Sequence, residues 1–137
     1  MTNQSNAAQA AAMDYYVISV HHTHRQDRYI TIWAPEDCGY RLRLQTSGRY
    51  TEARIRKRLG YYNSGCSNIA VPCHVVDAIA SDADPKEFDS PLPDGALPRV
   101  VMNTRANWKT LIANVFATPQ YPVRPEFPGA SRKKDSP

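Results

Sequence analysis

Residues 14–34, DYYVISVHHTHRQDRYITIWA, contain two runs of β-branched and aromatic residues, and these runs indicate the fold class. The first run, residues 14–24, and the second, residues 29–34, both have the composition typical of strands. The polar residues 25–28 between them are typical of a turn. We therefore expect this stretch to form an antiparallel hairpin.

The chain then turns and continues as a third strand. The segment 35–39, PEDCG, has the residue types of a turn, and in residues 40–45, YRLRLQ, apolar and basic residues alternate. We expect Tyr40, Leu42 and Leu44 to face the core, and Arg41 and Arg43 to face solvent. Residues 99–102 (RVVM) are a candidate for a returning fourth strand.

Three later segments are expected to be helical. Residues 52–62 follow Thr51, a suitable N-cap, and residues 72–80 place Pro72 in a first helical turn. Residues 104–117, capped by Asn103 or Thr104, carry an apolar stripe. The predicted fold is α+β: a small antiparallel sheet of three to four strands, packed on one face by two to three helices.

The composition indicates one domain in a chain of 137 residues. We expect a disordered arm at residues 1–13, a domain at 14–117 and a Pro-rich basic tail at 118–137. Within the domain, residues 81–98 are expected to form an acidic, Pro-rich loop. With no apolar run long enough to cross a membrane, no secretory signal and three cysteines, we expect a cytoplasmic protein that does not contact membranes.

Charge is the strongest functional signal in this sequence. Residues 41–58 are rich in arginine, whereas residues 77–94 are rich in aspartate, although the whole chain carries only +4. A concentrated positive surface attracts polyanions, so this stretch is the predicted binding site for a partner or a nucleic acid. The alternative is a solvated face neutralised by the chain's own acidic loop. The predicted contact residues are Arg41, Arg43, Arg49, Arg54, Arg56, Lys57 and Arg58.

On the predicted helix 52–62, the basic and apolar residues separate. Arg54, Lys57 and Arg58 lie almost opposite a face formed by Ile55, Leu59 and Tyr62.

The sequence after this helix, YYNSGCSN, adds aromatic rings and small polar groups to the basic residues. Tyr61 and Asn63 are therefore included in the predicted binding site, since rings, donors and cations together suit nucleotides or single strands. The alternative is a helix C-cap followed by an ordinary loop. No glycine-rich phosphate loop of standard spacing is present.

A metal-dependent enzyme is the third hypothesis. If residues 14–24 form a strand, His22 and His24 share a face, and further ligands are conceivable at Cys66, Cys73 and His74. The seven-residue separation of the two cysteines differs from the short spacing of zinc knuckles, and the second motif of two-histidine phosphoesterases is missing. We therefore expect no metal, no cofactor and no catalytic residue.

Five segments carry a resemblance to a known group of proteins. The group comprises small uncharacterised proteins of phages, prophages and plasmids, and the chain resembles it over Tyr15–Thr23, Tyr29–Pro35, Gly39-Tyr40, Tyr61–Pro72 and Asn103–Leu111. The resemblance implies an accessory protein of a mobile element, a class that includes anti-CRISPR proteins and other inhibitors of host defence.

From this resemblance, the leading hypothesis is a non-enzymatic inhibitor. It would bind a host defence ribonucleoprotein stoichiometrically through the Arg-rich face, in the cytoplasm of the host cell. The partner would be the defence protein complex or its nucleic acid, and a homodimer is also considered. The alternatives are a small nucleic-acid- or nucleotide-binding protein and the metal-dependent enzyme.

Overall fold

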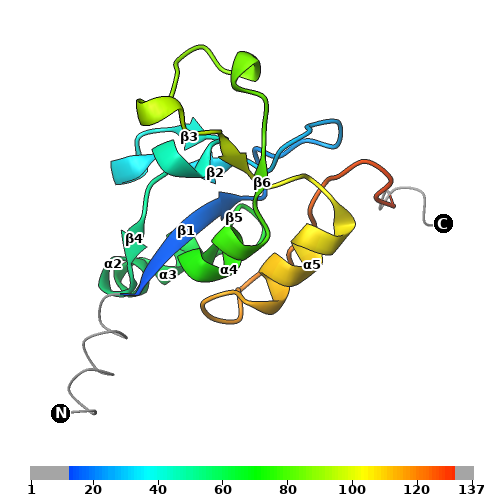
Figure 1. Cartoon of the computed structure of the whole chain (residues 1–137). Coiled ribbons are helices and arrows are strands. Elements are labelled where there is room, and N and C mark those ends of the chain that lie inside the picture. Colours follow the sequence, from blue (N-terminus) through cyan, green and yellow to red (C-terminus); the bar gives the residue numbers. More distant parts are fainter. Residues whose placement is uncertain (1–12, 132–137) are drawn as a thin grey trace.

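A single strand, β1 (Asp14–Ser19), organises the sheet in the computed structural model, which describes residues 13–131. One edge of β1 pairs with β5 (Asn68–Pro72) in antiparallel register, from Tyr15 opposite Pro72 to Ser19 opposite Asn68. The other edge pairs with β4 (Tyr50–Thr51) near the start of β1 and with β2 (Ile32–Trp33) near its end. Outermost lies β3 (Tyr40–Arg41), paired with β2 (Figure 1).

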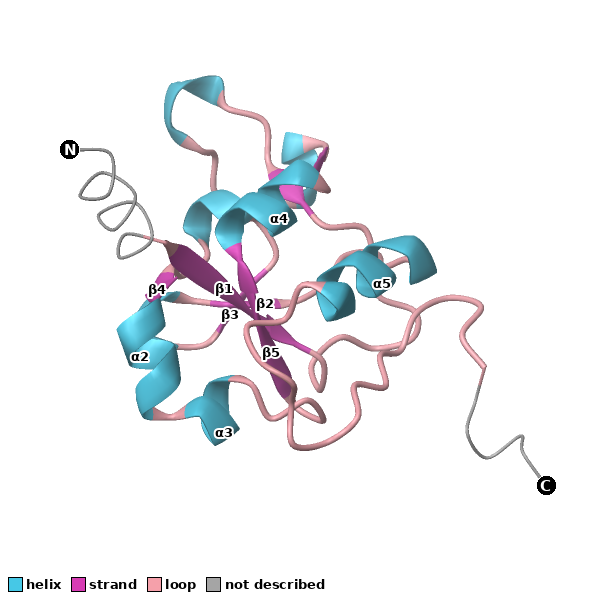
Figure 2. Cartoon of the chain, turned by 90° about the horizontal axis from the view of Figure 1, so that it is seen from below, coloured by secondary structure: helices cyan, strands magenta, loops and turns pink. Residues whose placement is uncertain are grey.

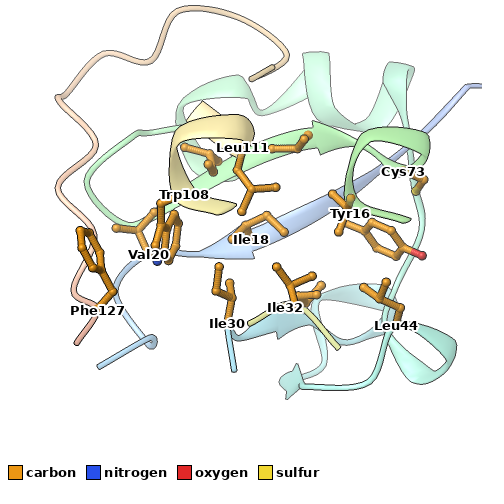
Figure 3. Close-up of a cluster of buried hydrophobic side chains, with 14 of the residues drawn as sticks. Tyr16, Ile18, Val20, Ile30, Ile32, Leu44, Cys73, Trp108, Leu111 and Phe127 are labelled. Carbon is orange, nitrogen blue, oxygen red and sulfur yellow. The ribbon is translucent and has the colours of Figure 1, made fainter. Parts of the chain in front are cut away.

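Both faces of β1 are buried. Tyr16 and Ile18 belong to one apolar cluster, whereas Tyr15 and Val17 belong to another on the opposite face. The first cluster includes residues of α4 (Cys73–Ala78) and α5 (Arg105–Ala113), and Figure 3 shows Trp108 and Leu111 beside Ile18. The second cluster includes Ile55 of α2 (Glu52–Lys57) and Tyr62 of α3 (Leu59–Tyr62).

The prediction that helices cover one face of the sheet is therefore wrong. Figure 2 shows α2 and α3 on the opposite side of the strands from α4 and α5. The physical reason is visible in β1 itself, where the run YYVI is apolar throughout rather than alternating. A strand of that kind exposes apolar side chains to water unless both of its faces are covered.

The predicted α+β class is confirmed. Within residues 13–131 the main sheet has five strands, a smaller sheet pairs β6 (Ser81–Asp82) with β7 (Arg99–Val100), and there are four α-helices. The strand β5 is not among the expected strands, yet it pairs with β1 over five residues of each strand.

The first strand ends at Ser19 rather than at residue 24. Thr23 donates from Oγ1 to the carbonyl oxygen of Ser19 at 2.7 Å, and the amide of His22 donates to Ser19 Oγ at 3.0 Å. These bonds turn the chain and take the place of further strand pairing. The histidines therefore lie in a loop, and the predicted strand face shared by His22 and His24 does not exist.

The predicted alternation in residues 40–45 is also wrong. Only Tyr40 and Arg41 are in strand conformation, and Tyr40 and Leu42 are exposed. Leu44 is buried as predicted, but it belongs to a 3₁₀ turn at Leu44–Thr46. The outer strand is too short for its alternation to decide which side chains reach the core.

The predicted helix 52–62 is divided in two. Thr51 caps α2 as predicted, accepting a bond from the amide of Arg54 at 3.2 Å. Arg58 has φ −137° and ψ 57°, which interrupts the helical ladder before α3. As a result Leu59 is exposed, while Ile55 and Tyr62 are buried as expected.

The other predicted helices are shorter than expected. Residues 72–80 yield α4, and residues 104–117 yield α5, whose N-cap Thr104 accepts a bond from the amide of Asn107 at 3.2 Å. Trp108 and Leu111 are buried as the apolar stripe predicts.

The predicted acidic loop 81–98 contains short 3₁₀ turns and the strand β6, and it folds over the β3 side of the sheet (Figure 1). Ion pairs fasten it: Arg28 to Glu87 at 2.9 Å and Arg99 to Asp82 at 2.9 Å.

Residues 118–131, which belong to the predicted Pro-rich tail, pack against the domain. Phe127 and Ala130 are buried in the first apolar cluster, and the amide of Tyr121 donates to the carbonyl oxygen of Ser64 at 3.0 Å. Residues 1–12 of the predicted arm and residues 132–137 at the basic end lie outside the described residues. None of the helices in the described part is long and apolar enough to cross a bilayer.

Candidate functional site

The arginines of the predicted basic face do not share one surface, because the fold pairs several of them with its own carboxylates. Arg56 pairs with Glu52 at 2.9 Å on α2, and Arg49 pairs with Asp77 at 3.6 Å across the sheet edge. These carboxylates reduce the positive potential that a partner would meet. For Arg49 and Arg56, the structure therefore agrees with the alternative that the chain's own carboxylates neutralise the positive charge. The carboxylates that do so, Asp77 and Glu52, lie outside the acidic loop 81–98.

Arg54 is the most strongly held of these side chains. Its guanidinium lies 3.0 Å from Glu36 and 3.2 Å from Asp37, and Nε donates to the hydroxyl of Tyr62 at 3.0 Å. The Tyr62 bond and these carboxylates raise the pKa of Arg54 above its ordinary value. Arg54 thus ties α2 to the 35–37 turn and to α3, and we assign it to the scaffold.

Lys57 and Arg58 differ, because both are exposed at the end of α2 and neither has a carboxylate within ion-pair distance among residues 13–131. The Arg58 guanidinium lies 4.1 Å from the ring centroid of Tyr61, which is 40% exposed. The ring of Tyr61 in turn meets Trp33 edge-on, with centroids 5.3 Å apart. We call Lys57, Arg58 and Tyr61 the α2–α3 surface.

Asn63 does not belong to this surface. Its side chain is buried, donates to the carbonyl oxygen of Ala117 at 2.7 Å and accepts from the amide of Ala70 at 2.9 Å. The assignment of Asn63 as a contact residue is therefore wrong. The helical break at Arg58 and the turn into β5 direct Tyr61 outward and Asn63 inward.

The proposed metal ligands are not brought together. Cys66 precedes β5 and Cys73 follows it, so the extended strand holds the two thiols at opposite ends. Cys73 is buried, and its burial raises the pKa of the thiol to about 12. The described part of the chain contains no group of three or more His, Cys, Asp or Glu residues placed to hold a metal ion.

Arg41 and Arg43 lie on a different part of the molecule, beside a pocket of about 410 Å³. Arg43 donates to the carbonyl oxygen of Ser90 at 2.6 Å, and its guanidinium stands 4.9 Å from the ring centroid of Phe88. The pocket also brings in His22, whose ring lies 4.3 Å from that of Tyr40. Its walls are formed by His22, Thr31, Tyr40, Arg41, Leu42, Arg43, Thr46 and Phe88.

Sequence reasoning missed this pocket because its residues come from segments far apart in the chain. The sequence feature that could have indicated the pocket is Phe88, because it is the only aromatic residue in the acidic segment 81–98. Its role as a wall appears only when the acidic loop folds back toward β3.

Comparison of the chain with known protein families, with curated proteins and with solved structures finds no match.

Proposed function

We propose that this protein is a non-enzymatic binding protein for single-stranded nucleic acid, and that the α2–α3 surface makes the contact. One observation carries the proposal: Arg58 stacks on the exposed ring of Tyr61 at 4.1 Å, next to Lys57, with no carboxylate of the described residues paired to either cation. Unpaired cations beside an aromatic ring attract phosphates and offer a stacking partner for a base.

The fold supports the availability of this surface. Arg54 and Arg56 on the same helix are bound to Glu36, Asp37 and Glu52, so they have fewer donors left for a phosphate. Trp33 and Tyr62 fix the ring of Tyr61 by edge-to-face contacts at 5.3 and 5.0 Å, so binding a base would order little additional structure.

The test is binding of a fluorescently labelled single strand of about twelve nucleotides, measured by anisotropy over a range of salt concentrations. We expect the double substitution Lys57→Ala/Arg58→Ala to weaken binding and to flatten the log–log salt slope by about 0.7 for each lost phosphate contact. Tyr61→Ala should weaken binding by about 1–3 kcal/mol if a base stacks there.

The matched control is Arg28→Ala, which removes an exposed arginine that is paired with Glu87 and lies outside the α2–α3 surface. This variant should bind as the parent does. The proposal is wrong if the parent shows no salt-sensitive binding, or if the double variant binds the strand as tightly as Arg28→Ala does.

An inhibitor of a host defence ribonucleoprotein is the second candidate, and the exposed apolar residues favour it. Leu59 is 36% exposed beside Arg58 and Tyr61, and tyrosine and arginine are the residue types that dominate protein–protein contacts. The segments of the mobile-element resemblance include β1, β2, β5 and most of α5, which form the core. If this candidate is right, the tag-purified chain should capture a defence complex from host lysate. Leu59→Ser, which adds no charge, should weaken that capture without changing binding to an isolated strand.

A further inference from the structure

The pocket beside β3 has the size and lining of a small-ligand site. Its volume of about 410 Å³ falls in the range of roughly 300–1,000 Å³ that is usual for such sites. The acidic loop supplies one of its walls, yet it contributes the ring of Phe88 and no carboxylate, and none of the lining residues is acidic. The pocket therefore suits an anion with an apolar part.

The two lining arginines are placed for different tasks. Arg43 is held by the Ser90 carbonyl and the Phe88 ring, so it contributes fixed positive charge. Arg41 is exposed and donates only to the carbonyl oxygen of Tyr40, at 3.0 Å, with no carboxylate of the described residues in ion-pair range. A guanidinium with free donors binds phosphate in a planar, two-pronged geometry.

The aromatic walls favour a flat ligand. Tyr40 is 45% exposed, and its ring is supported by His22 at 4.3 Å. Thr31 and Thr46 donate from their hydroxyls to the carbonyl oxygens of His22 and Arg43, so each hydroxyl oxygen retains capacity to accept a bond. A planar base with exocyclic donors matches this combination of rings and acceptors.

We propose that this pocket binds a nucleotide, with the base against Tyr40 and the phosphate on Arg41. The site uses none of Lys57, Arg58 and Tyr61, so it goes beyond the proposed strand binding and does not depend on it. Recognition requires both parts of the ligand, because the rings hold the base and the arginine holds the phosphate.

The experiment titrates the full chain separately with adenosine and uridine monophosphates and follows backbone amide NMR shifts. Adenosine alone and inorganic phosphate are the comparison probes. We expect at least one monophosphate to bind about tenfold more tightly than either comparison probe, with shifts at Thr31, Arg41 and Thr46. Arg41→Ala and Tyr40→Ala should each weaken this binding by about tenfold, whereas Tyr40→Phe should retain it.

One control variant separates this site from the α2–α3 surface. Lys57→Ala/Arg58→Ala should leave monophosphate binding unchanged, whatever it does to strand binding. Strand binding without monophosphate binding would overturn the pocket assignment alone, and the reverse result would overturn the proposed function alone.

Three further results would overturn the nucleotide assignment. The first is that inorganic phosphate binds as tightly as both monophosphates do, which would make the pocket a simple anion site. The second is tighter binding of O-phosphotyrosine than of either nucleotide, which would reassign the pocket to a phosphorylated peptide. The third is an Arg41→Ala variant, with the melting temperature of the parent, that binds the nucleotide unchanged.

Discussion

At the scale of single residues, buried asparagines join parts of the chain that are distant in sequence. Asn103 accepts a bond from the indole Nε1 of Trp108 at 2.6 Å and donates to the carbonyl oxygens of His24 and Asp27 at 3.2 and 3.0 Å. Its amide group thus fastens the hairpin loop to the start of α5. From the sequence, Asn103 was a candidate cap for this helix, but Thr104 performs that function.

We expect Asn103→Ala to lower the free energy of unfolding by about 1–3 kcal/mol. The substitution leaves the buried indole donor of Trp108 without its partner, and it removes one bond from the partly buried carbonyl oxygens of His24 and Asp27. A buried donor without a partner lowers stability because it loses its hydration when the protein folds. Chemical denaturation followed by tryptophan fluorescence measures the change.

The matched control is Asn114→Ala, since Asn114 donates to the carbonyl oxygen of Thr110 at 2.8 Å but is exposed. Its loss should change stability much less, because water replaces the bond. Equal effects of the two substitutions would show that Asn103 does not hold the loop.

At the scale of elements, the docking of residues 118–131 is the largest departure from expectation. Gly65 has φ +96°, and a Cβ at this position would collide with the carbonyl oxygen of Tyr121. The glycine therefore allows the returning chain to approach the turn before β5. From there the segment reaches the first apolar cluster, in which Phe127 lies beside Val20 and Trp108 (Figure 3).

We expect Phe127→Ala to reduce the free energy of unfolding by on the order of 3 kcal/mol, because it removes a buried aromatic ring from a packed cluster. Tyr121→Ala is the control from the same segment, since its ring is 50% exposed and its amide bond to Ser64 needs no side chain.

Differential scanning calorimetry compares the two variants with the parent. A melting temperature for Phe127→Ala equal to that of Tyr121→Ala would mean that burial of the Phe127 ring does not stabilise the fold.

At the scale of the whole molecule, buried tyrosine and cysteine side chains make the stability of the fold depend on pH in the alkaline range. Burial is the main cause that raises the pKa of Tyr50 to about 12 and that of Cys73 to about 12. The pKa of Tyr16 is also raised, by burial and by its hydrogen bond to Asp77. In the unfolded chain these groups lose their protons near their ordinary pKa values, about 8.5 for cysteine and about 10 for tyrosine.

The folded state therefore binds more protons than the unfolded state between about pH 8.5 and 12, so its stability must fall as the pH rises through that range. We expect the urea midpoint to be nearly constant from about pH 7 to 8 and to decline above about pH 9. We expect Cys73→Ala to have a lower urea midpoint than the parent at neutral pH. The decline of its midpoint below about pH 10 should be smaller than in the parent, because the variant lacks the thiol that titrates there in the unfolded chain. A midpoint that stays constant to about pH 11 in the parent would contradict this account.

The candidate binding surfaces also belong to the scale of the whole molecule. Charge counting placed seven cations in one stretch, but the tertiary structure distributes them over the α2–α3 surface, the β3 pocket and internal ion pairs. The exposure of Tyr61 could be predicted, because a tyrosine beside cations is exposed in many contexts. Asn63 could not be distinguished from it, because its burial depends on Ala117, more than fifty residues away.

Sequence patterns were enough to predict the α+β class, the helix cap Thr51, a second cap at Asn103 or Thr104, and the burial of Trp108 and Leu111. These features depend on neighbours within one or two turns, so periodicity and capping rules reach them. Only the tertiary structure decided that β5 pairs with β1, that helices cover both faces of the sheet and that Phe127 enters the core. It also decided which arginines are free, because an ion pair such as Arg54 with Glu36 depends on the distance that folding creates between residues, and neither composition nor periodicity contains that distance.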